Sequence, residues 1–314
     1  MLVIYTQFQA FLVGATHCDS CICDDQPSLR PPQQSNRPKV AHLFSYVRLK
    51  HRTIQTIHLA SIMPTSYFQT SPGEANCRLC GNWAAMTFEH IPPKSAFNDS
   101  RVVIKPVDQL IRLPTSEYEN VKGHASQGGV GGYSLCGPCN NFIGTKYGQS
   151  YVKLANSVAY RLTIHRHRAD FKTIVNVNLS DYHPIRLFKQ ILAMTFSINP
   201  PGYLQDHEEL ARFILNHRSN ELPQAYKVML YASRTNNTRL SAQFVALRAD
   251  SHVVLFSEIY SWPIGCVVMY ESEALRDDMF DMTWFSAFDF YEKRDMVLTL
   301  PILSTKSPMP GQYA

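Results

Sequence analysis

Two Cys-x-x-Cys pairs are the residues in this sequence best suited to chemistry. The first pair is Cys77 and Cys80, in CRLCG, and the second is Cys136 and Cys139, in LCGPCNNFIG. Each pair can fold into a tight turn that aims two sulfurs at one ion, so four thiolates satisfy tetrahedral zinc. Because all four ligands are protein groups, such an ion keeps no open position for substrate. We therefore expect a structural Zn²⁺ that contributes on the order of 10 kcal/mol to folding.

An acid and an imidazole stand between the two pairs. The stretch TFEHIPPKSAF, residues 87–97, contains Glu89 and His90 just before Ile91 and two prolines. If the zinc is structural, chemistry must come from the side chains that it holds in place. A histidine elsewhere in the chain would be interpreted as a hydrogen-bonded structural residue, but the position between the cysteine pairs favours a catalytic role for His90.

Three short motifs resemble those of the HNH endonuclease family. They are CRLC, then EHIPPK, where the family has an acid-His pair followed by an apolar residue and a proline, then CGPCN, with Asn directly after the last cysteine. The resemblance covers residues 76–151. It implies a ββα-metal finger, in which a β-hairpin carries the acid and His and the Asn opens a helix. Position by position, it implies that His90 is the general base and that Glu89 and Asn140 bind a second, catalytic divalent ion.

The implied roles agree with the chemistry of the side chains. A neutral imidazole that titrates near pH 7 can take a proton from the water that attacks a phosphodiester. Oxygen ligands such as the Glu89 carboxylate and the Asn140 amide suit Mg²⁺ or Mn²⁺, which neutralise charge on the phosphate.

The sequence departs from the family pattern in three ways. Glu replaces the commoner Asp at position 89, the spacer between His90 and Cys136 is long, and Asn141 follows Asn140, so either amide can be the ligand. The central Asn that steadies the base in the family has three candidates here: Asn98, Asn120 and His124.

Basic residues near these motifs are candidates for substrate binding. Lys94 and Lys146 could hold phosphates, although lysines near loops and helix ends are more often simply solvated. The run RLTIHRHR, residues 161–168, is equally consistent with a nucleic-acid contact and with a solvated strand face.

The second half of the chain shows periodic patterns of its own. Residues 171–179 alternate like a strand, and residues 184–196 form one apolar helical stripe. Residues 206–218 predict a second helix, in which Asp206 and Glu209 resemble a capping box. Four strand-like runs then predict an antiparallel meander: AYKVMLYAS, LSAQFVALR, HVVLFSEIY and IGCVVMY. We expect an α+β fold, a small zinc-stapled ββα-metal finger followed by a larger α+β domain with an antiparallel sheet.

These patterns divide the chain into three regions. Residues 1–62 contain no Glu and no sustained period, and we expect a disordered leader or an extension upstream of the natural start at Met63. Residues 63–154 are the expected HNH-like zinc domain. Residues 155–314 are an α+β domain of unknown role, with no catalytic constellation of their own. The motif CDSCIC, Cys18–Cys23, has no second pair nearby.

Composition and cysteine content bear on the location of the protein in the cell and on its binding partners. A formal charge of +5 is compatible with a phosphate-bearing partner but common among proteins that touch no nucleic acid. No stretch reaches the roughly 20 apolar residues that span a bilayer. The opening segment lacks the basic start and small-residue cleavage site of a signal peptide. Paired cysteines in a chain of 314 residues indicate metal binding more than disulfides, so we expect a cytoplasmic protein without a membrane anchor.

The favoured function is a metal-dependent endonuclease that acts on nucleic acid, DNA rather than RNA, with a protein partner for residues 155–314 also possible. The alternative is a non-catalytic zinc-binding module that grips nucleic acid or protein, in which Glu89 and His90 are structural. A thiol oxidoreductase is a third hypothesis; it requires accessible cysteines of low pKa and no bound zinc.

Overall fold

The structure is a computed structural model that describes residues 2–6, 71–110, 113–164, 173–247, 253–272, 276–305, 307 and 310–313. These residues group into one compact unit. Most of the expected leader, the Cys18–Cys23 motif, and residues 165–168 of the basic run lie outside the described residues. Leu2–Thr6 form strand β1, which the leader interpretation did not predict, although the sequence LVIYT is rich in β-branched and aromatic residues that favour strands.

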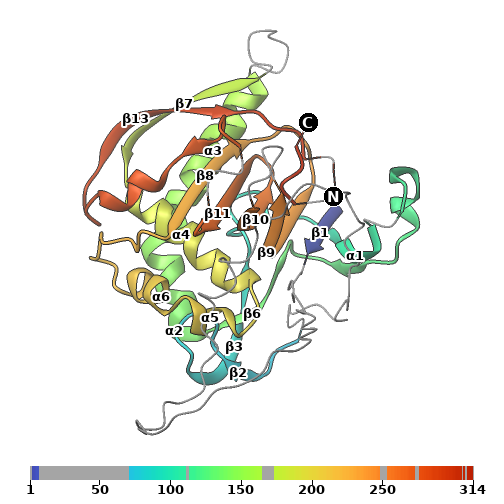
Figure 1. Ribbon diagram of the computed structural model, residues 1–314, viewed down its shortest axis with the longest axis horizontal. Coiled ribbons are helices and arrows are strands. Elements are labelled where there is room, and N and C mark those ends of the chain that lie inside the picture. Colours follow the sequence, from blue (N-terminus) through green and yellow to red (C-terminus); the bar gives the residue numbers. More distant parts are fainter. Residues whose placement is uncertain are drawn as a thin grey trace, which may run out of the picture. The chain divides into compact units, whose positions relative to one another are not determined.

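The largest sheet has the strand order β12-β8-β11-β10-β9-β1-β4-β5 (Figure 1). Its strands are β1, β4 (Val102–Pro106), β5 (His124–Ser126), β8 (Tyr226–Ala232), β9 (Thr238–Leu247), β10 (Val253–Ser261), β11 (Ile264–Tyr270) and β12 (Phe280–Asp281). The pairs β9–β10 and β10–β11 are antiparallel, as expected, whereas β1 pairs in parallel with β4 and β9, so the sheet is mixed. The meander is confirmed only from β9 onward. Strand β8 does not pair with β9 but with the edge of β11 that faces away from β10.

Two smaller sheets complete the strands. One joins β2 (Glu74–Asn76), β3 (Trp83–His90) and β6 (Gly131–Cys136), and the other joins β7 (Ile174–Tyr182) to β13 (Arg294–Pro301). Strand β7 confirms the predicted strand at residues 171–179 with its bounds shifted, and its burial alternates as the sequence does. The long spacer between β3 and β6 is explained by β4 and β5, which pair with each other in the large sheet.

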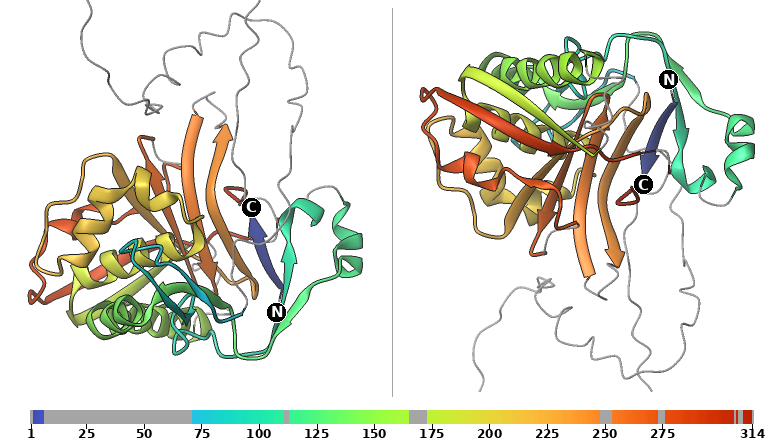
Figure 2. Two further views of the ribbon diagram at one scale, coloured as in Figure 1. Left: turned by 90° about the horizontal axis from the view of Figure 1, so that it is seen from below. Right: turned by 90° about the horizontal axis from the view of Figure 1, so that it is seen from above.

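The helices lie mainly between residues 137 and 215, on one side of the orange strands in Figure 2. They are α1 (Val107–Leu110), η3 (Thr115–Asn120), α2 (Gly137–Ile143), the π-helix η4 (Gly144–Gly148), α3 (Gln149–Ile164), α4 (Pro184–Ile198), α5 (Tyr203–Asp206), α6 (Glu208–Leu215) and η6 (Thr283–Ala287). The helical stripe at residues 184–196 is confirmed by α4. The expected capping box is wrong: Asp206 ends α5, and His207 is the N-cap of α6.

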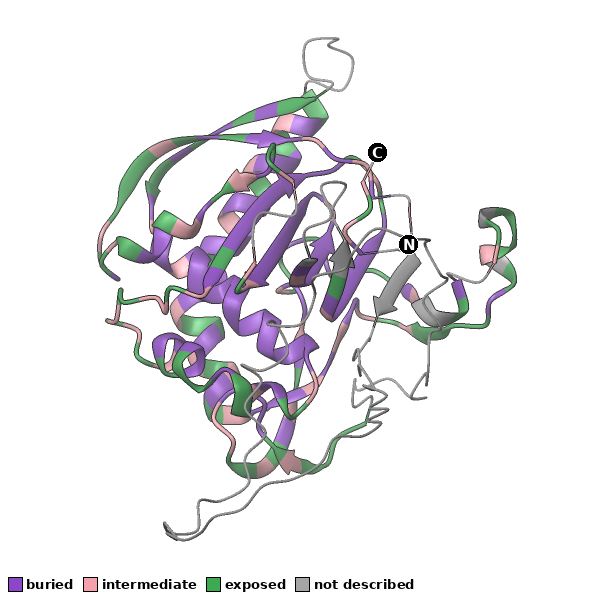
Figure 3. Cartoon of the chain, viewed as in Figure 1, coloured by how far each residue is buried: buried purple, intermediate pink, exposed green. Residues whose placement is uncertain are grey.

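Helix α4 is the centre of the core. Nearly all of its residues are buried, and it packs against α3, α6, η4, β6 and strands β9–β11. Figure 3 shows it almost wholly in the colour of buried residues. The expected boundary at residues 154 and 155 lies inside α3, and a single hydrophobic cluster contains residues from both sides of it. The cysteine motifs and the second half of the chain therefore share one core.

A buried ion pair ties the C-terminal segment to the large sheet. Arg239 on β9 and Glu258 on β10 are both fully buried, with 2.7 Å between Nη2 and Oε1. The hydroxyl of Tyr313 also donates to Glu258, at 2.7 Å, and Arg239 donates to the carbonyl of Ser307 at 2.9 Å. Each charge thus has partners inside the protein, and removing Arg239 leaves the Glu258 carboxylate buried with hydroxyl donors but without its cation.

We predict that Arg239→Met lowers the free energy of unfolding by about 3–5 kcal/mol, because the Glu258 carboxylate loses its cation. The control is Arg276→Met, which breaks a partly exposed pair with Asp278 and is expected to cost about 0–1 kcal/mol. Denaturant titration measures both. Equal effects of the two substitutions would contradict the prediction.

His207 is a buried, uncharged histidine between α5 and α6. Its Nδ1 shares a hydrogen bond of 2.6 Å with the hydroxyl of Tyr226, and its ring lies 3.9 Å from that of Tyr203 between centroids. Burial lowers the pKa of His207 to about 4, because an imidazolium in the protein interior loses most of its hydration. The unfolded chain, with the ordinary pKa near 6.5, therefore binds the proton first as the solution is acidified.

We predict that His207 makes the fold lose stability as the pH falls from about 6.5 to about 4, by an amount on the order of 3 kcal/mol. The measurement is the free energy of unfolding against pH for the wild type and for His207→Gln, which cannot titrate. The wild-type curve should fall more steeply than the variant curve below pH 6.5. Parallel curves would show that His207 does not titrate in this way.

Candidate functional site

The four predicted cysteines converge on one point. Their sulfurs all lie within 4.8 Å of one another, and the Sγ atoms of Cys80 and Cys136 are 3.8 Å apart. Tetrahedral zinc with Zn–S bonds of about 2.3 Å requires sulfurs about 3.8 Å apart, so the cluster has the right size for this ion. Cys77 and Cys80 lie in the turn after β2, whereas Cys136 ends β6 and Cys139 lies in the first turn of α2.

The four thiols of the cluster shift one another's pKa values. A hydrogen bond from Cys139 lowers the pKa of the Cys77 thiol to about 4, helped by the backbone N–H of Cys136, which donates to its sulfur at 3.4 Å. Its bond to Cys77 and burial raise the pKa of Cys139, and burial raises that of Cys80. Four thiolates this close repel one another unless a divalent ion lies between them. The cluster could hold a metal ion such as zinc.

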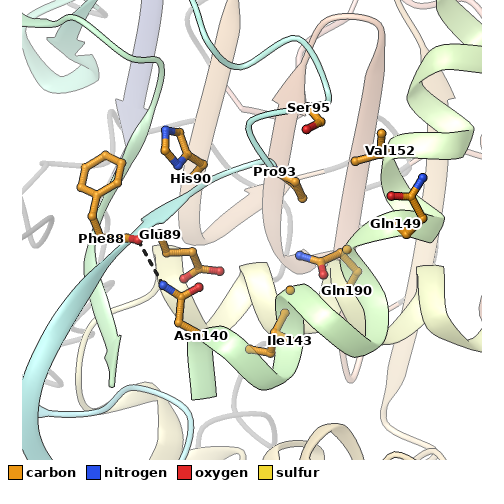
Figure 4. A pocket seen from close by; sticks show the side chains of 12 residues that line it. Phe88, Glu89, His90, Pro93, Ser95, Asn140, Ile143, Gln149, Val152 and Gln190 are labelled. Atoms are coloured by element: carbon orange, nitrogen blue, oxygen red, sulfur yellow. Dashed lines mark hydrogen bonds between the residues drawn. The ribbon is translucent and has the colours of Figure 1, made fainter. Parts of the chain in front are cut away.

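The cysteine cluster joins a hairpin to a helix. Strands β3 and β6 are antiparallel, with Met86 opposite Cys136 and His90 opposite Gly131. Helix α2 begins directly after Cys136, and the amide nitrogen of Asn140 donates to Thr87 Oγ1 at 3.0 Å and to the Phe88 carbonyl at 3.1 Å. In Figure 4 the amide oxygen of Asn140 lies on the side of the Glu89 carboxylate. The first turn of α2 is thus fastened to the strand that carries Glu89 and His90.

Glu89 is a buried carboxylate, only 5% exposed. Its Oε2 accepts hydrogen bonds from Ser134 on β6, at 3.1 Å, and from Ser197 at the end of α4. Burial raises the pKa of Glu89 to about 7, and the two hydroxyls act in the opposite direction. The side chain is therefore held in one orientation, in a place where its negative charge is costly unless a cation is near.

Arg78 connects the cysteine turn to the centre of the fold. It lies between Cys77 and Cys80, and its Nη1 donates to the carbonyls of Ser197 at 2.7 Å and Asn199 at 2.9 Å. These carbonyls are at the C-terminal end of α4, where the helix dipole favours a positive charge. The same helix end thus binds both Arg78 and Glu89.

His90 is half-buried on the opposite face of β3 from Glu89. Its Nε2 lies 3.0 Å from the carbonyl oxygen of Gly128, and its ring lies edge-on to Phe88. Since a carbonyl oxygen only accepts, Nε2 carries the hydrogen, and a neutral His90 presents the lone pair of Nδ1. Burial lowers the pKa of His90, assisted by the charge of Lys94, so the neutral form is favoured near pH 7.

Asn98 holds the loop that positions His90. Its side chain is buried; its nitrogen donates to the carbonyls of Pro92 and Val130, both at 2.7 Å, and its oxygen accepts from the Val130 N–H at 2.6 Å. Gly129 has φ +95°, and a Cβ there would lie 2.1 Å from the Asn98 carbonyl oxygen, so only glycine fits. Among the three candidates for this role, Asn120 and His124 are exposed.

Glu89, His90 and Asn140 line one pocket of ≈ 290 Å³ (Figure 4). Asn141 is not among the described residues that line it, and neither are Lys94 and Lys146. Lys94 is exposed, and the Nζ of Lys146 lies 5.9 Å from the ring of Phe290. The structure thus brings the three predicted active-site residues together and leaves both predicted substrate-binding lysines off the pocket wall.

Sequence reasoning missed the residues that support the pocket: Arg78, Ser134, Gln190 and Ser197. Arg78 stands between two cysteines and could have been noticed for that reason. Gln190 and Ser197 are polar residues on buried faces of a mainly apolar helix, and a polar residue on a buried face is itself a signal of a specific contact.

No protein-family model, curated protein or solved structure matches this chain. Among the described residues, no helix combines the length and the apolar character needed to cross a membrane.

We predict that the purified chain carries one zinc ion and that Cys139→Ser loses it, with a drop of several kcal/mol in the free energy of unfolding because the cluster joins β6 and α2 to the β2 turn. Elemental analysis and denaturant titration provide the measurements. The matched control is Cys266→Ala, a buried cysteine outside the cluster, which should keep the metal. A wild-type chain without bound metal, or a Cys139→Ser chain that retains it, would refute this assignment.

Proposed function

We propose that this chain is a metal-dependent endonuclease of the HNH type, which hydrolyses phosphodiester bonds of nucleic acid, DNA rather than RNA. The observation that carries the proposal is the shared pocket of Glu89, His90 and Asn140, next to the four-cysteine cluster. The order strand β3, strand β6, helix α2 also agrees with the ββα-metal finger that the motifs resemble.

The residues present are suited to a hard divalent cation such as Mg²⁺ or Mn²⁺. The ligands would be the Glu89 carboxylate and the Asn140 amide oxygen, and one or two protein oxygens are usual for Mg²⁺, which keeps waters and binds substrate phosphates. The raised pKa of Glu89, caused by burial, marks a place where a cation would be stabilising. Such an ion would polarise the phosphate and neutralise charge on the leaving oxygen.

His90 would act as the general base. Its Nδ1 accepts the proton of the attacking water, while the Gly128 carbonyl holds Nε2–H and stabilises the imidazolium that forms. Asn98 keeps the loop around Gly128 in place through its bonds to Val130. Ser134 and Ser197 orient the Glu89 carboxylate toward the pocket. In this proposal residues 155–314 complete the site through α4.

The alternative is a zinc-binding module without catalysis that binds nucleic acid or protein. The observation that favours it is that Glu89 and His90 both have hydrogen-bond partners within the protein, as structural residues do. The two proposals differ in the role of His90. The endonuclease needs the imidazole of His90 to cleave nucleic acid, whereas the zinc-binding module cleaves nothing.

We predict that the zinc-loaded wild type cuts plasmid or single-stranded DNA in Mg²⁺ or Mn²⁺ and that His90→Ala lowers the rate at least about 100-fold, because the base is lost. Glu89→Gln should raise the Mg²⁺ concentration needed for activity, because the ligand loses its charge. Gel assays of plasmid, single-stranded DNA and RNA measure the cleavage.

The matched control is His217→Ala. His217, like His90, is half-buried with its ring edge-on to a phenylalanine, but it is not part of the pocket wall. This variant should cut at the wild-type rate. If the zinc-loaded wild type cuts none of the substrates, or if His90→Ala cuts as fast as the wild type, the non-catalytic alternative is favoured.

A further inference from the structure

Gln190 is a buried polar side chain that lines the candidate pocket, and its carbonyl oxygen accepts no hydrogen bond from the residues that the structure describes. It lies in the middle of α4 and is only 3% exposed. Figure 4 shows its carboxamide turned into the pocket, toward the side formed by Asn140 and Ile143. A buried carbonyl oxygen left in this state is costly, and a turn of the carboxamide that brings this oxygen toward the pocket would let a ligand supply the missing donor.

The wall beside Gln190 leaves room for such a ligand. The π-helix η4 begins and ends with Gly144 and Gly148, and both line the pocket. A Cβ at Gly144 would meet nothing within 4 Å, and one at Gly148 would lie 3.8 Å from the Oε1 of Gln190. Segments of π-helix inside longer helices are frequent at functional sites. The pocket thus has a polar group at its buried end and little side-chain bulk along one wall.

The chemistry of a carboxamide limits what can bind there. The carboxamide oxygen accepts a hydrogen bond and the carboxamide nitrogen donates one. Both are satisfied by a single group that carries a donor beside an acceptor. The sugar and phosphate groups within a DNA strand offer acceptors only. The edge of a nucleobase offers both, and glutamine pairs with adenine in this bidentate way.

We propose that Gln190 binds the edge of one unpaired nucleobase, which enters the pocket next to the phosphodiester that is cut. The inference rests on the proposed endonuclease function and names its substrate class as single-stranded or locally unpaired nucleic acid. A pocket of ≈ 290 Å³ has room for a single base, and a base in a duplex is stacked, so it reaches such a pocket only when it is flipped out.

The test measures binding, so that it does not depend on turnover. Zinc-loaded full-length His90→Ala protein in Mg²⁺ is titrated into fluorescein-labelled 12-nucleotide strands of DNA, their duplexes and the matching RNA strands, with fluorescence anisotropy as the readout. We expect the single strands to bind at least tenfold more tightly than the duplexes. Adding Gln190→Leu should weaken single-strand binding about tenfold, the loss expected for a bidentate base contact, with little change for duplex DNA.

Stability provides an independent readout. Because Gln190→Leu removes an unpartnered polar group from a buried helix face, the variant should unfold at the same temperature as the parent protein or higher.

Gly144→Leu is the second variant: it fills the pocket from a position with open space and should also weaken single-strand binding while keeping its zinc. The matched control is Gln243→Leu, a half-buried glutamine on β9 that is not part of the pocket wall.

Three results would overturn the inference. The first is single-strand binding that is unchanged in Gln190→Leu, which would show that water alone satisfies the carboxamide. The second is a lower unfolding temperature of Gln190→Leu with its remaining folded fraction binding normally, which would make Gln190 structural. The third is a loss confined to RNA, which would assign the contact to a 2′-hydroxyl. Single-strand binding that depends on Gln190 in a protein that cuts nothing would support the inference and reject the endonuclease.

Discussion

The convergence of four sulfurs is the constraint on which the candidate site depends. It brings the turn after β2 to the end of β6 and to the first turn of α2, which follows β6 directly. The three predicted site residues lie on these segments or on the strand that pairs with them. Glu89 and His90 are on the strand that pairs with β6, and Asn140 follows the last cysteine by one position. A cation at the cluster would therefore fix the relative positions of residues more than 50 positions apart in sequence.

Helix α4 is the second support, and it comes from the half of the chain that carries no motif. Its C-terminal end binds Arg78 from the cysteine turn and Glu89 from β3, and its middle supplies Gln190 to the pocket. The helix is buried on nearly all sides, so these polar side chains are held in fixed positions by close packing. The two halves of the chain are coupled through this helix, and damage to the core around α4 would reach the site directly.

The orientation of Glu89 and His90 illustrates how a strand distributes adjacent functional groups. Neighbouring side chains on a strand point to opposite faces, so the carboxylate reaches Ser134 on β6 and Ser197 at the end of α4, while the imidazole lies near Phe88 and the loop at Gly128. The two meet at one pocket because β3 ends there and the loop fastened by Asn98 closes over it. Burial then sets their protonation in opposite ways, raising the pKa of Glu89 and lowering that of His90.

The sequence by itself determined the cysteine cluster, the pocket residues Glu89 and His90, the helix α4 and the antiparallel strands from β9 onward, because ligand spacing and hydrophobic period are local properties. It left Asn140 and Asn141 as alternatives, and the fold puts Asn140 in the pocket wall. Only the tertiary structure decided the strand order, in which β8 pairs with β11, and the place of β1. It also decided which asparagine holds the loop and which polar residues of α4 reach the site. These depend on contacts between segments distant in the chain, where burial and hydrogen-bond geometry, rather than residue type, select the partner.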